Sequence, residues 1–305
     1  MKILIATEKP FAASAAKEIQ EVITHAGFTP VMLEKYAHRE ALLAAVEDAA
    51  GLIVRSDKVD NEVIDAAKQL KIIVRAGAGY DNIDLNAATA RGIIVMNTPG
   101  QNSNAVAELA LGLMVYAKRN FFGGTTGTEL KGKTLGIHAF GNVGRNVARI
   151  AQGFGMNIIA YDAYCPDEVM LAAGVTPVHS AEELYRQSNI VSLHIPATDE
   201  TRRSIGRKLV SLMPKGALLV NTARKEVINE EELIELMQER GDIRYATDIM
   251  PAADVRFSEL FPERYFSTPK KMGAQTAEAN CAAGVAAAKQ AVGFLKDGTD
   301  KFRVN

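Results

Sequence analysis

The stretch Leu135–Gly155, LGIHAFGNVGRNVARIAQGFG, decides the fold. An apolar run leads into the turn AFGNVG, and an amphipathic helical pattern follows it. This order of strand, turn and helix is typical of a dinucleotide-binding unit, here with Ala139 in the first of the three glycine positions. The turn has to be tight and open so that a pyrophosphate can rest on the positive N-terminus of the helix. Alanine is compatible with the first position if its φ stays negative.

The turn and the carboxylate after it indicate which cofactor binds. Asp162 ends the next apolar run, about twenty residues further on, where a carboxylate accepts hydrogen bonds from ribose hydroxyls and repels an added phosphate. The sequence therefore predicts NAD rather than NADP. The residues of the turn expected to contact it are Phe140, Gly141, Asn142, Val143 and Gly144.

Short Val/Ile/Leu runs alternate with helical patterns along the chain, which indicates βαβ units and mostly parallel sheets. One series runs from KILIAT at residue 2 to GIIVMN at residue 92, and a second begins with KTLGIHAF at residue 133. Two series predict an α/β protein with two Rossmann-like, doubly wound parallel-sheet domains and an interdomain cleft. We expect a discontinuous first domain, residues 1–98 plus 276–305, and a second domain, residues 99–275.

Composition excludes several classes of protein. With 305 residues, 48% hydrophobic content and a formal net charge of −1, a strong bias toward nucleic acid or membrane is not expected. The N-terminal sequence MKILIATEKP has too short an apolar run for a secretory signal, so we expect a cytoplasmic protein. Cys165 and Cys281 have no neighbouring Cys or His at metal-ligand spacing, so neither a disulfide framework nor a metal site is expected.

Four segments together resemble the D-isomer-specific 2-hydroxyacid dehydrogenases: VRAGAGYDNIDL from Val74, NTPGQNSNAVAELALGLM from Asn97, HIPATDETRRSIG from His194 and MPKGALLVNTARKEVINEEEL from Met213. Within the family the likeness is greatest to the D-3-phosphoglycerate dehydrogenases. The resemblance implies that the first domain binds substrate, that the second binds NAD, and that the chain works as a homodimer. It ends at Asn305, so we expect no C-terminal regulatory domain of the kind that longer members carry.

The substrate of such an enzyme is an anion that has to be held while a hydride leaves it. Arg224, in VNTAR at the carboxyl end of an apolar run, is the candidate guanidinium for the substrate carboxylate. The backbone N–H groups of Ala76 and Gly77 are candidates for the same carboxylate. For a phosphate on the substrate, the candidate cations at strand ends are Arg55, Lys58 and Arg75.

Four further residues at strand ends are expected to contact the cofactor. They are His194, Pro196, Thr222 and Asp248.

The loop Ser267–Asn280, STPKKMGAQTAEAN, departs from the family pattern. Family members usually place a catalytic histidine after TP and pair it with a glutamate. Here the loop holds Lys270 and Lys271, while Ala253 and Asp254 stand at and beside the glutamate position. If the loop is aligned with the family at MGAQT, Lys271 takes the place of the histidine. If it is aligned at Pro269, Lys270 takes that place. We expect Lys271 to act, buried near Arg224, with Asp254 as an open candidate for the missing carboxylate.

Three functions fit these features. The first is NAD-dependent oxidation of D-3-phosphoglycerate, a phosphorylated 2-hydroxy acid, in serine biosynthesis, with lysine as the acid/base. The second is reduction of a small 2-keto acid such as glyoxylate or hydroxypyruvate. The third is a catalytically silent NAD-binding sensor. Arg55, Arg224 and a titratable cation in the loop favour an enzyme, because a sensor has no use for the cations that hold a substrate.

Overall fold

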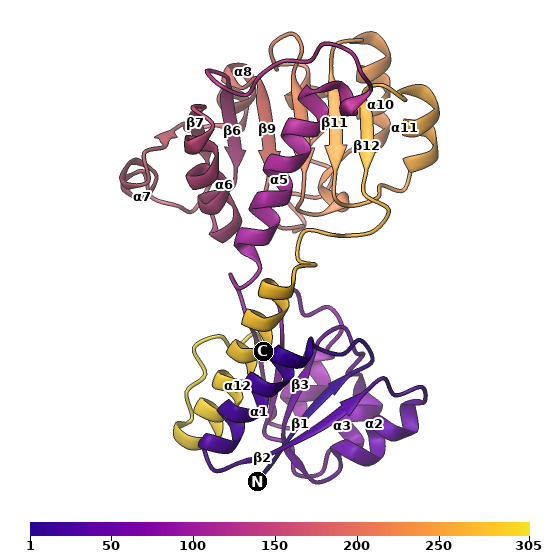
Figure 1. The fold of residues 1–305 in the computed structure, drawn as a ribbon, viewed down its shortest axis with the longest axis vertical. Helices are drawn as coiled ribbons and strands as arrows, with labels where there is room; N and C mark the ends of the chain where they lie inside the picture. The colour runs from indigo at the N-terminus through magenta and orange to yellow at the C-terminus, as the bar shows by residue number, and fades with distance from the viewer. The chain divides into compact units, whose positions relative to one another are not determined.

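The computed structural model describes residues 1–305, and the chain divides into two compact units. Unit 1 consists of Met1–Asn102 and Thr276–Asn305, and unit 2 of Ser103–Gln275. Each unit is a parallel β-sheet covered by helices, so the expected α/β class with two Rossmann-like parallel-sheet domains is confirmed (Figure 1). No helix is long and apolar enough to cross a membrane.

Unit 1 contains a five-stranded sheet in the order β2-β1-β3-β4-β5, with every pair parallel. The central strands β1, β3 and β4 are buried on both faces, which explains their apolar runs, whereas the edge strand β2 is only partly buried. The strands are β1 (Lys2–Thr7), β2 (Thr29–Glu34), β3 (Ala49–Val54), β4 (Ile72–Arg75) and β5 (Ile94–Asn97). The helices are α1 (Ala13–His25), α2 (Arg39–Val46), α3 (Asn61–Ala66), α4 (Leu85–Ala90) and α12 (Ala277–Asp297).

The C-terminal segment completes unit 1. Helix α12 packs along α1, β3 and β4, and its ends are set by local chemistry. Thr276 caps the start by accepting a hydrogen bond from the Ala279 N–H (3.1 Å), and Gly298 ends the helix with a left-handed φ of 72°. Beyond it, the N–H of Val304 donates to the Val95 carbonyl (2.9 Å), so the last residues lie antiparallel along β5.

Unit 2 contains a seven-stranded parallel sheet in the order β12-β11-β10-β9-β6-β7-β8. The strand order reverses between β6 and β9, which is the switch point at which open α/β sheets bind ligands. The strands are β6 (Thr134–His138), β7 (Asn157–Tyr161), β8 (Thr176–Pro177), β9 (Ile190–Leu193), β10 (Leu218–Asn221), β11 (Arg244–Thr247) and β12 (Tyr265–Ser267).

The helices of unit 2 cover both faces of this sheet and enclose two apolar clusters, one on each side. Helix α5 packs on α6, β10 and β11, within unit 2. The helices are α5 (Ser103–Lys118), α6 (Asn142–Gly153), α7 (Asp167–Ala172), α8 (Ala181–Gln187), α9 (Arg207–Val210), α10 (Glu230–Glu239) and α11 (Asp254–Leu260), with 3-10 turns η1 (Asn120–Phe122) and η2 (Lys225–Val227).

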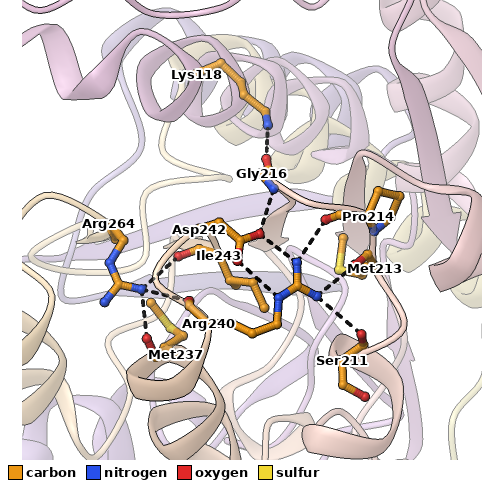
Figure 2. A network of polar contacts seen from close by, with 10 residues as sticks. All are labelled: Lys118, Ser211, Met213, Pro214, Gly216, Met237, Arg240, Asp242, Ile243 and Arg264. Atoms are coloured by element: carbon orange, nitrogen blue, oxygen red, sulfur yellow. Dashed lines mark hydrogen bonds and ion pairs between the residues drawn. The ribbon is translucent and has the colours of Figure 1, made fainter.

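A polar network fastens the loops that lead into β10 and β11 (Figure 2). Arg240 donates to both carboxylate oxygens of Asp242, at 3.1 and 2.6 Å, and to the carbonyls of Met213 and Pro214. Asp242 in turn accepts the N–H of Gly216 at 2.7 Å. These bonds satisfy loop groups that no strand partner reaches.

Two ionisable groups of this network have shifted pKa values. Hydrogen bonding to Arg240 lowers the pKa of Asp242 to about 2. Lys118 donates to the Gly216 carbonyl at 2.7 Å, and burial, followed by the like charge of Arg244, lowers the pKa of its ammonium to about 8. The network therefore favours the ionised carboxylate of Asp242 and disfavours the charge of Lys118.

Asp242→Asn is expected to lower the free energy of unfolding by about 2 kcal/mol at pH 7, because the carboxylate has a lower pKa in the folded than in the unfolded chain. This stabilisation is present above the unfolded pKa and is lost as the pH falls through the folded pKa. Urea unfolding, monitored by circular dichroism, should show that the difference in free energy of unfolding between wild type and variant is about half as large at pH 3 as at pH 7. Asp199→Asn, at an exposed carboxylate without a bonded partner, is the control and should change little. A gap that does not depend on pH would contradict the assignment.

Candidate functional site

The turn between β6 and α6 has the geometry that a dinucleotide requires. A Cβ built on Gly144 would lie 2.3 Å from the carbonyl oxygen of Ala139, so α6 can approach β6 only with glycine at this position. A Cβ on Gly141, in contrast, would meet nothing within 4 Å. Gly141 is the N-cap of α6, and no side chain caps the N–H groups of the first turn. The helix start is therefore open for an anion.

The expectation for Ala139 is wrong in one respect. Its φ is +81°, in the left-handed region that favours glycine, and not negative as the alanine led us to expect. The tight turn imposes this conformation, because the Ala139 N–H donates to the Tyr161 carbonyl (2.8 Å) while its own carbonyl faces Gly144. The turn thus keeps the shape of the glycine version at a cost in backbone strain.

Asp162 lies at the end of β7 and joins two loops. Its Oδ2 accepts the N–H of Phe140 at 2.7 Å, and its Oδ1 accepts the N–H groups of Tyr164 and Cys165 at 2.8 and 2.9 Å. The side chain is half-buried, and its position beside the turn is the one expected for a ribose contact. Asn142 and Val143 follow on the exposed and half-exposed start of α6.

Two polar groups at the neighbouring strand ends have no partner in the chain. His194 follows β9 and Thr222 follows β10, and the buried His194 Nε2 and Thr222 Oγ1 make no hydrogen bond. Burial, followed by the charge of His138, lowers the pKa of His194 to about 3, so its ring is neutral near pH 7. Buried polar atoms without partners are rare in folded proteins. His194 lies at the switch point of the sheet, and Thr222 lies one strand further along the same edge. Pro196 is exposed two residues after His194.

Asp248, expected to contact the cofactor, also has a structural role inside unit 2. It is fully buried, and its Oδ1 accepts the N–H of Met272 while its Oδ2 accepts the N–H of Gly273, both at 2.7 Å. The hydroxyl of Thr268 donates to Oδ1 at 3.0 Å. Asp248 therefore anchors the lysine loop, the segment Ser267–Asn280 that carries Lys270 and Lys271. Both oxygens bond inside the protein, and a carboxylate with about four acceptor sites still has room for a cofactor contact.

The lysine loop is fixed at its base, but both lysine side chains are exposed. This differs from the expected burial of Lys271 beside Arg224. Ala253 is the N-cap of α11, and its N–H and that of Ala252 donate to the carboxylate of Glu230. Asp254 accepts the hydroxyl of Tyr265 at 2.5 Å. The carboxylate left open as a substitute for the family glutamate thus has a tyrosine as its partner.

Arg224 lies three residues past the end of β10, at the carboxyl edge of the sheet. Asn221 holds the turn by donating to the Arg224 carbonyl at 3.0 Å. The guanidinium donates to the Ala223 carbonyl at 2.9 Å and is half-exposed. Since one neutral carbonyl uses only one of its five N–H donors, the fork remains able to bind a carboxylate.

In unit 1, Arg55 follows β3 and its guanidinium is tightly held. It donates to the carbonyls of Lys9 (2.8 Å) and Pro10 (3.1 Å) and to the side-chain oxygen of Asn280 (2.6 Å). The guanidinium also lies over the ring of Phe11, 5.1 Å from its centroid. Asn280 was not anticipated from the sequence as part of this site, because the contact joins residues 225 positions apart.

Arg75 and Gly77 occupy the turn after β4. Arg75 donates from Nε to the Arg55 carbonyl at 3.0 Å, and a Cβ on Gly77 would lie 1.4 Å from Arg75 Nη1. Gly77 has a φ of +149°. Glycine is therefore needed here both for the backbone conformation and for the space that the guanidinium fills.

The two N–H groups expected to bind the substrate carboxylate already have partners in the chain. The N–H of Ala76 bonds the Val54 carbonyl at 2.8 Å, and that of Gly77 bonds the Arg75 carbonyl at 2.9 Å, so both are already used. Ala76 continues the ladder between β3 and β4, which alternation alone could not show. The N–H groups of Ala78 and Gly79, which have no partner in the chain, are the open donors of this turn.

Lys58 is the most exposed of the three candidate cations in unit 1. Its side chain is 73% exposed and lies 3.4 Å from a carboxylate oxygen of Asp60. Arg55 is half-buried and contacts only uncharged acceptors through its side chain. Of these two, Arg55 has the better fixed and less neutralised charge.

Comparison with known proteins agrees with this geometry. Residues 113–265 match the family model described as D-isomer specific 2-hydroxyacid dehydrogenase, NAD binding domain. The chain is 41% identical to a D-3-phosphoglycerate dehydrogenase of Methanocaldococcus jannaschii over 92% of its own length, and spans about half (54%) of that relative. It is 38% identical to a hydroxypyruvate reductase of Thermotoga maritima, covering 82% of this chain and 86% of the relative.

A solved structure shows a similar fold over the whole chain. It is the NAD+-bound 3-phosphoglycerate dehydrogenase of Entamoeba histolytica, with a TM-score of 0.89 and 49% sequence identity. The match covers 100% of this chain and 98% of that one.

The strain at Ala139 leads to a stability prediction. Glycine at this position should relieve the roughly 1–2 kcal/mol that a left-handed conformation costs an L-residue. This relief offsets the lost methyl contact and the greater freedom of the unfolded chain, so Ala139→Gly should be close to neutral. Ala160→Gly, at a buried alanine of β7, has no strain to relieve and should be the less stable variant by about 1 kcal/mol or more. Thermal unfolding measures both, and equal losses would show that Ala139 is unstrained.

Proposed function

The chain belongs to the D-isomer specific 2-hydroxyacid dehydrogenases, and we propose that it oxidises D-3-phosphoglycerate to 3-phosphohydroxypyruvate with NAD. The observation that carries the choice of substrate is the guanidinium of Arg55, which is fixed by uncharged acceptors and keeps its charge for a phosphate. The likeness to two phosphoglycerate dehydrogenases supports the same choice. A homodimer forms part of the proposal.

The described residues fit the cofactor. The open Gly141, the close approach at Gly144 and the uncapped first turn of α6 suit a pyrophosphate, and Asp162 suits the adenine ribose. The unpartnered His194 Nε2 at the switch point and Thr222 Oγ1 after the next strand offer hydrogen bonds at the carboxyl edge of the sheet. When bound, NAD supplies the acceptor for the hydride that leaves C2 of the substrate.

In the proposed mechanism, Arg224 binds the substrate carboxylate and Lys271 handles the proton. In the oxidative direction, the neutral amine of Lys271 takes the proton of the C2 hydroxyl as the carbonyl forms. In the reductive direction, its ammonium returns that proton to the developing alkoxide. Asp248 holds the loop that carries the lysine. Arg55 binds the phosphate of the substrate.

A second candidate is reduction of an unphosphorylated 2-keto acid. The similarity to the hydroxypyruvate reductase supports it, since the match covers 86% of that relative. The chain is also 35% identical to a glyoxylate reductase of Thermococcus litoralis, and this match covers 83% of that relative. The two candidates differ in whether the phosphate contributes to binding.

A substrate comparison separates them. We expect NADH formation from D-3-phosphoglycerate to exceed that from D-glycerate and D-lactate in kcat/KM. Arg55→Ala should raise KM for 3-phosphohydroxypyruvate by about 10- to 100-fold, the value of hydrogen bonds to a charged group, and change KM for hydroxypyruvate little. Lys68→Ala, which removes an exposed cation from the same unit, is the matched control. Equal losses of Arg55→Ala on both substrates would support the unphosphorylated alternative.

The acid/base role of Lys271 has its own test. Lys271→Ala should lower kcat by about 10²–10⁴ in both directions while NADH still binds, as measured by fluorescence titration. Lys270→Ala, one residue away in the same exposed loop, should do much less. A larger loss in Lys270→Ala would move the role to that residue. Wild-type protein that binds NADH but turns over no hydroxy or keto acid would indicate the silent sensor.

A further inference from the structure

Asn280 is the one side chain that accepts a hydrogen bond from the Arg55 guanidinium. Asn280 lies in the first turn of α12, and its Nδ2 donates to the Thr276 carbonyl at 2.8 Å. This bond fixes which way the amide faces, so that its oxygen accepts from Arg55 Nη2 at 2.6 Å. The Thr276 carbonyl at the start of α12 thus fixes the orientation of the Asn280 amide, and the amide oxygen fixes the position of the Arg55 guanidinium.

Every acceptor that the guanidinium contacts is uncharged. Two are the carbonyls of Lys9 and Pro10, and the third is the amide oxygen of Asn280. The nearest acid in the sequence, Asp57, directs its carboxylate elsewhere. It accepts the Glu8 N–H and the Tyr36 hydroxyl, both at 2.7 Å, and the backbone N–H of Arg55 at 3.2 Å.

Hydrogen bonds to uncharged acceptors fix the Arg55 guanidinium without pairing its charge with a carboxylate. A carboxylate in place of the Asn280 amide would hold the guanidinium equally well, but the ion pair would cancel much of its attraction for a second anion. Half-burial already makes the charge costly and lowers the pKa of Arg55, although a guanidinium stays protonated at neutral pH. Neutral hydrogen-bond acceptors leave the guanidinium more of its attraction for a phosphate than a bonded carboxylate would, although the charge of Asp57 also acts on it. Because the guanidinium is already fixed, a phosphate can bind without rearrangement.

We propose that Asn280 is a positioning and specificity-determining residue: by holding Arg55 through an uncharged oxygen, it reserves the guanidinium for the substrate phosphate. This inference rests on the proposed function. It assigns the preference for a phosphorylated over an unphosphorylated substrate to the pair Arg55 and Asn280, and not to Arg55 alone.

Asn280→Asp is the sharp test, because it keeps the size and the oxygen that accepts from Arg55, while it replaces the Nδ2 donor to the Thr276 carbonyl and adds a negative charge. The charge falls in the first turn of α12, where it is favourable for the helix. KM for 3-phosphohydroxypyruvate should rise by about tenfold or more, while KM for hydroxypyruvate stays within about threefold. Asn280→Gln, which keeps a neutral acceptor, should lie closer to wild type than Asn280→Asp does.

Lys289→Gln is the matched control, since it changes the net charge by the same amount on an exposed position of the same helix. It should leave both KM values as in wild type. Circular dichroism and thermal unfolding identify any variant that fails to fold. If either Asn280→Asp or Asn280→Gln fails to fold, the KM values of the other variant are compared with those of wild type.

The outcomes separate the inference from the function it rests on. If wild type prefers the phosphorylated substrate and Arg55→Ala abolishes the preference, but Asn280→Asp keeps it, the inference is wrong and the proposed function stands. Equal rises in both KM values for Asn280→Asp would make Asn280 merely structural and also overturn the inference. If wild type shows no preference for the phosphorylated substrate, the proposed function fails and the inference fails with it.

Discussion

The close approach of α6 to the end of β6 is the constraint on which the nucleotide-binding part of unit 2 depends. With a Cβ on Gly144 the helix would have to move away from the Ala139 carbonyl, and its open first turn would no longer face the turn that precedes it. The same approach forces Ala139 into a left-handed conformation and brings Phe140 within reach of Asp162. Strain, helix position and the carboxylate contact therefore share one cause.

Much of this organisation could be predicted from the sequence, because it depends on local patterns. Apolar runs bounded by turn residues predicted the strands, and the spacing of the turn and Asp162 predicted the nucleotide-binding βαβ unit. The position of α12 could be read from Thr276 and Gly298, which cap its two ends. In these cases the residue type answers directly to a local backbone requirement.

The misplaced details all depend on which partner a polar group finds in three dimensions. The N–H groups of Ala76 and Gly77 looked available until the ladder with β3 and the turn itself accounted for them. Asp248 was expected only as a cofactor contact, and its bonds to a loop more than twenty residues later were not anticipated. Asn280 gave no signal at all, since its partner is Arg55. Hydrogen-bond partners distant in sequence leave no periodicity to detect.

The path of the chain through unit 1 has a consequence for how the protein is made. Unit 2 is a continuous segment, whereas unit 1 needs α12 against α1 and the last residues along β5. During synthesis the first five strands leave the ribosome long before these pieces exist, and domains generally fold as units. The first-made part of the chain must therefore wait without the helix that covers β3 and β4 beside α1, while the part made after it can already fold. Chaperones that shield exposed apolar surface would act on the N-terminal strands for the whole of this interval.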